Sequence, residues 1–306
     1  MPEHILKGRT AIVTGASRGL GKAIAAALAD AGARIAAVAR DLGRLSETAS
    51  EIESRGGEVA VFRADITDEA EVARLELDVS ERLGRVDILV NNAGINIRKP
   101  LVEFSLDEWN SVMTTNVTGP FLMCRAFVPH MKGRGYGRVL NVTSTMSHVS
   151  LPQRSAYSAS KAALLGLTRA LALEAAQDGI TAVAISPGPF ATEMNTALLE
   201  NPEATQFFTS RVALGRWGKL NEVGSLAVYL CSEEAGFITG HGHPDRRRLV
   251  RAVVSAAPGT PVRRSRTSRA PAILSSPRPT RRAPDPHARL WRCRAAVRRC
   301  APPAPG

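Results

Sequence analysis

Thr10-Ala-Ile-Val-Thr14, Gly15-Ala-Ser-Arg-Gly19-Leu-Gly21 and Lys22-Ala-Ile-Ala-Ala-Ala-Leu-Ala29 follow one another without interruption near the start of the chain. The first run is apolar and β-branched, which favours a strand, and the last is rich in helix formers. Glycines between a strand and a helix let the backbone turn tightly, and the helix start offers N–H groups and a positive dipole to an anion. This stretch therefore predicts a glycine bend that holds the pyrophosphate of a dinucleotide.

The same alternation continues along the chain. Apolar runs at 34–39, 59–62 and 86–90 each end in polar or small residues, and the intervals 42–56 and 68–83 have helical composition. Parallel strands bring their carboxyl ends to one edge of a sheet, where ligands bind. We expect an α/β fold, a doubly wound Rossmann-type parallel sheet in a single domain over residues 1–242, with a further long helix from about 106 to 131.

The end of the second predicted strand bears on the choice of cofactor. A carboxylate at this point usually holds the ribose hydroxyls of NAD(H), whereas an arginine accommodates the 2′-phosphate of NADP(H). Ala39 offers no carboxylate, Arg40 follows it, and Arg18 in the glycine bend adds a second positive charge. The sequence thus predicts NADP(H) in preference to NAD(H). The alternative is that Arg40 is a solvated loop residue.

Tyr157 and Lys161 stand four residues apart in Ser155-Ala-Tyr-Ser-Ala-Ser-Lys161, and Ser144 lies thirteen positions before Tyr157. Residues four apart share one face of a helix, so the phenol and the ammonium can point into the same cleft. A positive charge about 4 Å from a phenol favours the phenolate by roughly three pKa units, which makes it a usable general acid or base. An ordinary surface helix is the alternative for this pair taken alone.

Six motifs stand in one order along the chain, namely Thr14-Gly15-x3-Gly19-x-Gly21, Asn91-Asn92-Ala93-Gly94, Asn116, Ser144, Tyr157-x3-Lys161 and Pro187-Gly188-x3-Thr192. With these motifs and separations, residues 5–242 resemble the short-chain dehydrogenase/reductase family. The resemblance implies an NAD(P)-dependent enzyme that interconverts a carbonyl and a secondary alcohol without a metal. The cofactor would carry the hydride and the protein would supply position and proton transfer.

The resemblance also implies a role for each motif. Tyr157 would be the catalytic acid or base, Ser144 would hydrogen-bond the substrate oxygen, and Lys161 would bind the nicotinamide ribose and lower the pKa of Tyr157. Asn116, the fourth catalytic residue, would hold a water in the proton relay. The full set of predicted cofactor-binding residues is Gly15, Ser17, Arg18, Gly19, Leu20, Gly21, Arg40, Asp65, Ile66, Asn92, Ala93, Gly94, Tyr157, Lys161, Pro187, Gly188 and Thr192. Taken singly, Asn116 could mark a helix kink and Asp65 could cap the next helix.

Three further stretches bear on the substrate. Residues 92–100, 185–195 and 214–218 are similar to enzymes of the gluconate 5-dehydrogenase type, and less closely to 3-oxoacyl-carrier-protein reductases. The resemblance implies a variable substrate lid from about 190 to 212, since loops carry specificity. The polar candidates for a small hydroxylated acid are His148, Gln153, Arg154 and Asn195, and Arg154 could pair with a carboxylate or be a solvated loop residue.

The chain changes character after Phe237-Ile-Thr-Gly240, where the family pattern implies a last strand. Residues 243–306 hold sixteen Arg, no Lys and two acids, a net of +14, whereas the whole chain is +12, so residues 1–242 carry a net of −2. This Arg- and Pro-rich tail is predicted to be disordered. It could be a basic arm for nucleic acid or an acidic membrane surface, or a family-specific extension; we favour a slipped reading frame.

Composition limits the remaining possibilities. About 240 residues suffice for one doubly wound domain, and no apolar run approaches a membrane span, so we expect a cytoplasmic protein. The four cysteines have no metal-site spacing. We expect a small-molecule carbonyl or alcohol as substrate, no membrane or nucleic-acid partner, and a homodimer or homotetramer if the last strand is intact. An inactive scaffold or a basic-tailed nucleic-acid-binding protein is the alternative of another class.

Overall fold

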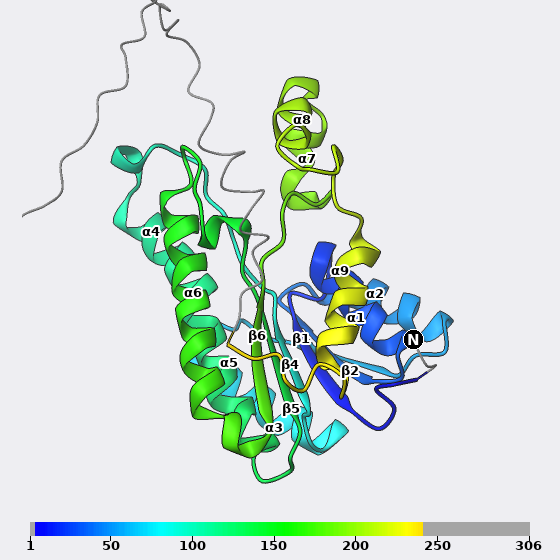
Figure 1. Cartoon of the computed structure of the whole chain (residues 1–306). Coiled ribbons are helices and arrows are strands. Elements are labelled where there is room, and N and C mark those ends of the chain that lie inside the picture. Colours follow the sequence, from blue (N-terminus) through cyan, green and yellow to red (C-terminus); the bar gives the residue numbers. More distant parts are fainter. Residues whose placement is uncertain (1–3, 241–306) are drawn as a thin grey trace, which may run out of the picture. The chain divides into compact units, whose positions relative to one another are not determined.

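Six parallel strands form one sheet in the computed structural model, which describes residues 4–240 (Figure 1). The strands are β1 (Thr10–Thr14), β2 (Arg34–Ala39), β3 (Val59–Arg63), β4 (Ile88–Asn91), β5 (Gly137–Val142) and β6 (Ile180–Ile185). Their order is β3-β2-β1-β4-β5-β6, and the order reverses direction beside β1, between β1 and β4. Ligands of doubly wound sheets bind at this switch point. The predicted fold class, a doubly wound parallel sheet, is confirmed.

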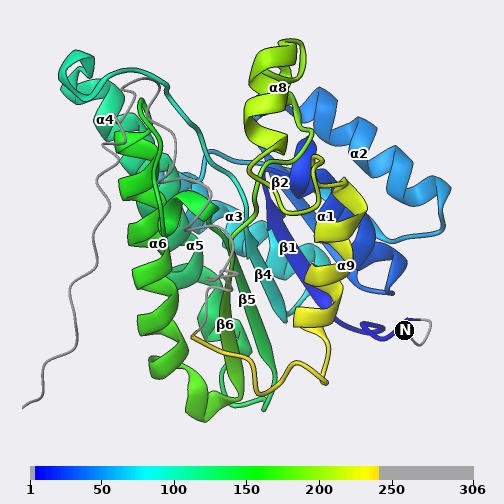
Figure 2. The same ribbon diagram turned by 45° about the horizontal axis from the view of Figure 1, so that its top comes forward.

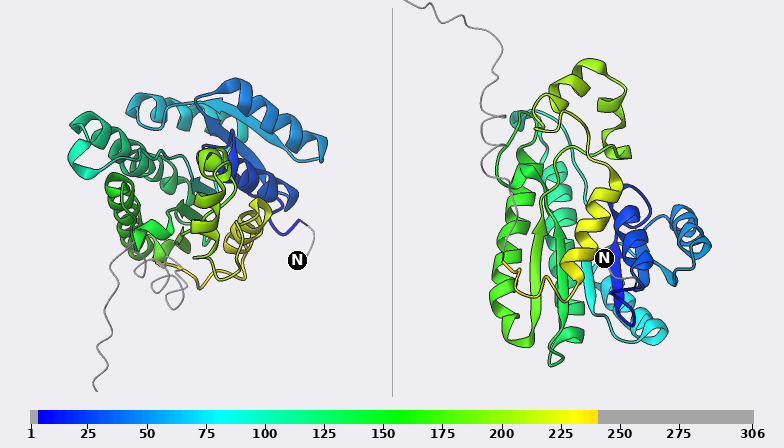
Figure 3. Two further views of the ribbon diagram at one scale, coloured as in Figure 1. Left: turned by 90° about the horizontal axis from the view of Figure 1, so that it is seen from above. Right: turned by 45° about the vertical axis from the view of Figure 1, so that its right-hand side comes forward.

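Helices cover both faces of the sheet (Figure 2). One layer holds α1 (Gly19–Asp30), α2 (Leu42–Ser54) and α9 (Leu220–Cys231), and the other holds α3 (Glu69–Leu83), α5 (Gly119–Phe127) and α6 (Ser155–Glu174). The helix α4 (Leu106–Met113) leads into the second layer, while α7 (Thr196–Leu199) and α8 (Pro202–Thr209) stand beyond the carboxyl end of β6 (Figure 3). The two helix layers cover the faces of the sheet, so its carboxyl edge remains as the place where a ligand could bind.

Alternate residues of each strand enter two separate cores. In β1, Ala11 and Val13 pack toward Ile24 and Leu28 of α1, whereas Ile12 packs into the opposite core. Side chains of a strand alternate between its two faces, and a sheet covered on both faces therefore needs an apolar residue at nearly every position. This requirement explains why the strands read as continuous apolar runs.

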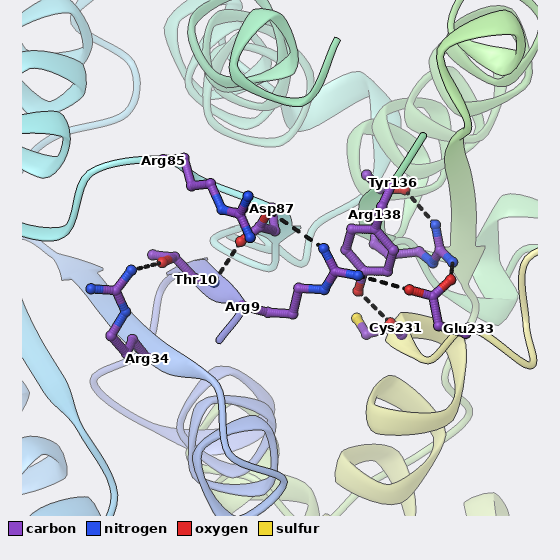
Figure 4. A network of polar contacts seen from close by, with 10 residues as sticks. Arg9, Thr10, Arg34, Arg85, Asp87, Tyr136, Arg138, Cys231 and Glu233 are labelled. Carbon is purple, nitrogen blue, oxygen red and sulfur yellow. Dashed lines mark hydrogen bonds and ion pairs between the residues drawn. The ribbon is translucent and has the colours of Figure 1, made fainter. Parts of the chain in front are cut away.

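A polar network ties the amino ends of the strands, at the edge opposite the glycine bend (Figure 4). Asp87 is 2% exposed and accepts a hydrogen bond of 2.9 Å from the backbone N–H of Thr10. The guanidiniums of Arg9 and Arg138 lie 3.5 and 4.1 Å from the ring centroid of Tyr136. Every buried charge in this network has a partner of opposite charge or an aromatic face, so the network fixes the sheet without offering a site.

The long helix predicted from about 106 to 131 is divided in the structure. The helix α4 is followed by a π-helical turn, Thr114–Thr118, then by α5 and by a 3-10 turn, Val128–Met131. Asn116 lies in the π turn, where its side chain bonds both backbone groups of Ile95. A π turn inserts one residue into the helix and is frequent at functional sites, so the break places Asn116 toward the strand ends.

The predicted last strand, the tail and the hypothesis of a slipped reading frame concern residues that lie outside the described range. Within that range, the backbone N–H of Gly240 donates to the carbonyl of Ala182 on β6 at 2.9 Å. No helix among residues 4–240 is both long and apolar enough to cross a membrane.

Candidate active site

The glycine bend between β1 and α1 is closed by side chains from the end of β4. Gly15 and Gly19 have φ angles of +64° and +55°, in the left-handed region that side chains rarely adopt. A Cβ atom at Gly21 would lie 2.2 Å from the carbonyl oxygen of Gly15. Asn92 donates through Nδ2 to the carbonyls of Thr14 and Gly15 at 3.0 and 3.2 Å. Only glycine fits at 21, and the bend is held rigidly at the strand end.

A cleft of about 830 Å³ opens at this edge of the sheet. It is lined by Gly15, Ser17, Arg18, Gly19, Leu20, Arg40, Asp65, Ile66, Asn92, Ala93, Gly94, Tyr157, Lys161, Pro187, Gly188 and Thr192, which is every predicted cofactor residue except Gly21. Gly21 instead packs against the backbone carbonyl of Gly15 and the side chain of Asn92. Among the described residues, no side chain caps the start of α1 and no acid lies in its first turn, which suits an incoming pyrophosphate.

Charged side chains gather at the end of β2, where the adenosine ribose of a dinucleotide would lie. Arg40 Nη1 is 3.5 Å from Asp65 Oδ2. Burial alone would raise the pKa of Asp65, but hydrogen bonds from Thr67 and the charge of Arg40 outweigh it and lower the pKa. Asp65 is not the N-cap of the next helix, because Asp68 takes that position. The carboxylate of Asp65 is therefore held in the cleft wall by Thr67 and Arg40.

Tyr157 and Lys161 lie on one face of α6 and line the cleft together. Burial raises the pKa of the Tyr157 phenol, and a hydrogen bond with Ser144 and the charges of Arg154 and Arg98 only partly oppose this. The predicted lowering of the Tyr157 pKa by Lys161 is therefore wrong for this structure. The Lys161 ammonium is 5.7 Å from the centre of the Tyr157 ring and donates to the carbonyl of Val142 at 2.7 Å.

Lys161 is itself almost wholly enclosed. Burial lowers the pKa of its ammonium to about 8, because removal from water disfavours the charged form. A Cβ atom at Gly94 would lie 3.4 Å from Lys161 Nζ and 3.0 Å from Asn116 Oδ1, so both side chains meet the backbone at this glycine. Asn116 also donates to Ser160 Oγ at 3.0 Å. Asn116 is fully buried and does not itself line the cleft.

Of the four predicted substrate residues, only Asn195 lines the cleft. Arg154 lies outside its lining, as does Arg98. Arg154 lies beside Tyr157, where burial and the charge of Arg98 lower the pKa of its guanidinium to about 10. Asn195 lines the cleft and accepts a hydrogen bond of 3.0 Å from Arg98 Nη2. His148 contacts Ser186 Oγ at 3.4 Å, and Gln153 is exposed with a φ angle of +65°; neither lines the cleft.

Several residues at or near the cleft were missed in the sequence, among them the charged residues Arg98, Arg44 and Glu193. Arg98 lies within the quoted stretch 92–100, but nothing in that stretch distinguished it from Lys99. Arg44 of α2 and Glu193 after β6 both line the cleft, and they are joined by an ion pair of 2.9 Å. These two residues are 149 positions apart, and no local pattern predicts such a contact. The only feature of the sequence that could have pointed to Arg44 is its place four residues after Arg40, which follows a predicted strand.

The chain is similar to known proteins over most of its length. A profile of the family described as Enoyl-(Acyl carrier protein) reductase matches residues 15–244. A gluconate 5-dehydrogenase of Gluconobacter oxydans is 37% identical over 235 residues, which cover 77% of this chain and 92% of that protein. A 3-oxoacyl-[acyl-carrier-protein] reductase of Vibrio harveyi is 35% identical, with 77% of this chain and 94% of that protein covered.

A solved structure is similar over the same region. The gluconate 5-dehydrogenase from Burkholderia cenocepacia in complex with NADP and tartrate has a TM-score of 0.75 and 34% identity, covering 79% of this chain and 95% of that one. With the glycine bend and the Tyr157–Lys161 pair, these matches define an oxidoreductase that uses a nicotinamide cofactor and acts on CH–OH groups. The chain belongs to the short-chain dehydrogenase/reductase family.

Proposed function

We propose that this enzyme interconverts a keto sugar acid and its hydroxy acid with NADP(H). The observation that carries the proposal is a pair of half-buried arginines near the acid/base candidate Tyr157. Arg98 donates to Asn195 of the cleft lining at 3.0 Å, and Arg154 directly precedes α6, the helix of Tyr157. A guanidinium binds a carboxylate by two parallel hydrogen bonds, and partial burial strengthens that interaction. A substrate with a carboxylate near its carbonyl would satisfy this site.

The cofactor residues suit the phosphorylated dinucleotide. Arg18, Arg40 and Arg44 line the cleft where the second strand ends, and Ala39 supplies no carboxylate for a ribose hydroxyl pair. When bound, the nicotinamide ring would supply or accept the hydride. Gly15, Gly19 and the start of α1 would hold the pyrophosphate, and Lys161 would hold the nicotinamide ribose.

The proton would move at the phenol of Tyr157. In the direction of reduction, the neutral phenol would donate its proton to the carbonyl oxygen, while Ser144, which hydrogen-bonds that phenol, would orient the same oxygen. Asn116 donates to Ser160, the residue before Lys161 on α6, so Asn116 would help to keep Lys161 in position. In the direction of oxidation, the phenolate would take the proton of the alcohol.

The raised pKa of Tyr157 gives a pH dependence with a definite sign. The phenol is mainly protonated at neutral pH, so the phenolate fraction, and with it kcat for oxidation, is expected to rise by up to about tenfold per pH unit from pH ~7 to pH ~9. The kcat for reduction should stay level over the same range. Saturating NADP(H) is needed, because Lys161 loses its charge near pH 8. Equal pH dependence in the two directions would contradict the assignment of Tyr157.

The alternative substrate is a 3-oxoacyl thioester on a carrier protein, which the match to the Vibrio harveyi reductase favours. The decisive comparison measures kcat/KM with a keto sugar acid and with an acetoacetyl thioester under the same conditions. We expect at least about tenfold higher kcat/KM for the sugar acid, since only that substrate pairs a carboxylate with the arginines. A preference for the thioester would overturn the proposal.

The homo-oligomeric state and the cytoplasmic location stay predictions. A nucleic-acid-binding role would rest on residues 243–306, which lie outside the described range.

A further inference from the structure

One carboxylate of the cleft is held by two arginines of the cofactor end. Glu193 Oε2 accepts from Arg44 Nη1 at 2.9 Å and from Arg18 Nη1 at 3.3 Å. Arg18 is the residue before α1, Arg44 lies in the first turn of α2, and Glu193 follows β6, so the contact joins three separate parts of the chain. All three residues line the cleft.

The other acids nearby are held differently. Asp41 pairs with the Arg44 guanidinium at 3.6 Å but also accepts from the backbone N–H of Arg44 and thereby caps α2. Asp65 pairs with Arg40 at 3.5 Å but also accepts from the backbone N–H and hydroxyl of Thr67. Both are fixed parts of the cleft wall. Glu193 instead has arginine guanidiniums as the hydrogen-bond partners of its carboxylate in the described part of the chain, and its side chain is 53% exposed. The Glu193 carboxylate can therefore move away from the two arginines without breaking a hydrogen bond to the backbone.

We propose that Glu193 is a competitor for the 2′-phosphate of the cofactor, and that Arg44 is a third arginine for that phosphate. This inference rests on the proposed use of NADP(H). A carboxylate oxygen within hydrogen-bond distance of two guanidiniums marks a position that also suits a phosphate oxygen. A phosphate with two negative charges at this position would displace the single charge of Glu193.

The displacement would reach the substrate side of the cleft. Glu193 and Asn195 lie in one 3-10 turn, Glu193–Asn195, which we call the lid turn. Asn195 accepts from Arg98 Nη2 at 3.0 Å and donates to the carbonyl of Phe190 at 3.0 Å. The lid turn is therefore bound to Arg18 and Arg44 through Glu193, and to Arg98 through Asn195. If the phosphate displaced Glu193, the lid turn would lose its bonds to the cofactor end and could adjust around a substrate.

The test measures binding by calorimetry with two probes, adenosine 2′,5′-bisphosphate and adenosine 5′-monophosphate, which differ only in the 2′-phosphate. In the full chain, Glu193→Gln should tighten binding of the bisphosphate about fivefold and leave the monophosphate unchanged, since two exposed ion pairs no longer compete. Arg44→Gln should weaken bisphosphate binding about tenfold. Glu200→Gln, an exposed acid after α7, is the matched control and should change neither.

A second readout follows the lid turn directly. Hydrogen exchange of the backbone amides of residues 193–199 should speed up when the bisphosphate binds to the wild type, and should be fast in Glu193→Gln without any ligand. Unchanged bisphosphate affinity in Glu193→Gln, with the preference for the bisphosphate intact in the wild type, would overturn the role of Glu193 alone. Equal affinity of both probes in wild type and variant would instead overturn the proposed use of NADP(H).

Discussion

Replacing Tyr157 by Phe is expected to lower kcat by about a thousandfold in both directions while the Kd for NADPH stays within about twofold. The substitution removes the hydroxyl that would donate or accept the proton, and a positioned acid or base contributes roughly 10²–10⁴ to a rate. The ring stays in its buried place beside Ser144 and Arg154. Stopped-flow measurement of turnover, with cofactor binding measured separately by fluorescence, tests the two halves of the expectation.

The matched control is Tyr229→Phe, which makes the same change at a tyrosine of α9 that is 41% exposed. Its kcat should equal that of the wild type. A Tyr157→Phe variant that kept more than about a tenth of the wild-type kcat would assign proton transfer to another group.

The second large effect is expected at Arg154. Arg154→Gln should lower kcat/KM for a keto sugar acid about 30-fold, which corresponds to about 2 kcal/mol for one hydrogen bond to a charged group. A neutral ketone of the same length has no carboxylate to pair, so its kcat/KM should change little. The backbone carbonyl of Arg154, which accepts from the N–H of Ser158 at the start of α6, is untouched by the substitution.

Arg169→Gln gives the control for this experiment, because Arg169 is an exposed arginine on the same helix. It should leave kcat/KM unchanged for both substrates. An equal loss for the acid and the neutral ketone in Arg154→Gln would show that Arg154 supports the structure of the site and does not select the charge of the substrate.

The sheet was largely predictable because its signals are local. The strands at 10–14 and 34–39 have the predicted limits, and the order of strand, glycine bend and helix is dictated by residue types that neighbour one another. The sequence did not indicate that the helix near Asn116 would be broken by a π-helical turn. That turn depends on bonds to Ile95, which comes from a different segment of the chain.

The relative position of two site residues was predictable only where both lie on the same helix or strand. Tyr157 and Lys161 share a face of α6, as their spacing indicates. The electrostatic relation between them was mistaken, since Lys161 donates to Val142 and the phenol is influenced by Arg154 and Arg98. The sequence could not indicate the partners of Glu193 or the position of Arg98, because these contacts arise when distant segments meet at the carboxyl edge of the sheet.

The central claim is that Tyr157 delivers a proton to a substrate carbonyl next to a bound nicotinamide. Its most direct test is a single turnover with NADPH deuterated at the transferable position, excess protein and 5-keto-D-gluconate, with mass spectrometry of the product. The account predicts a hydroxy acid that carries one deuterium at the new carbinol carbon, and about a thousandfold slower labelling with Tyr157→Phe. Labelling of the product by Tyr157→Phe at the wild-type rate would contradict it.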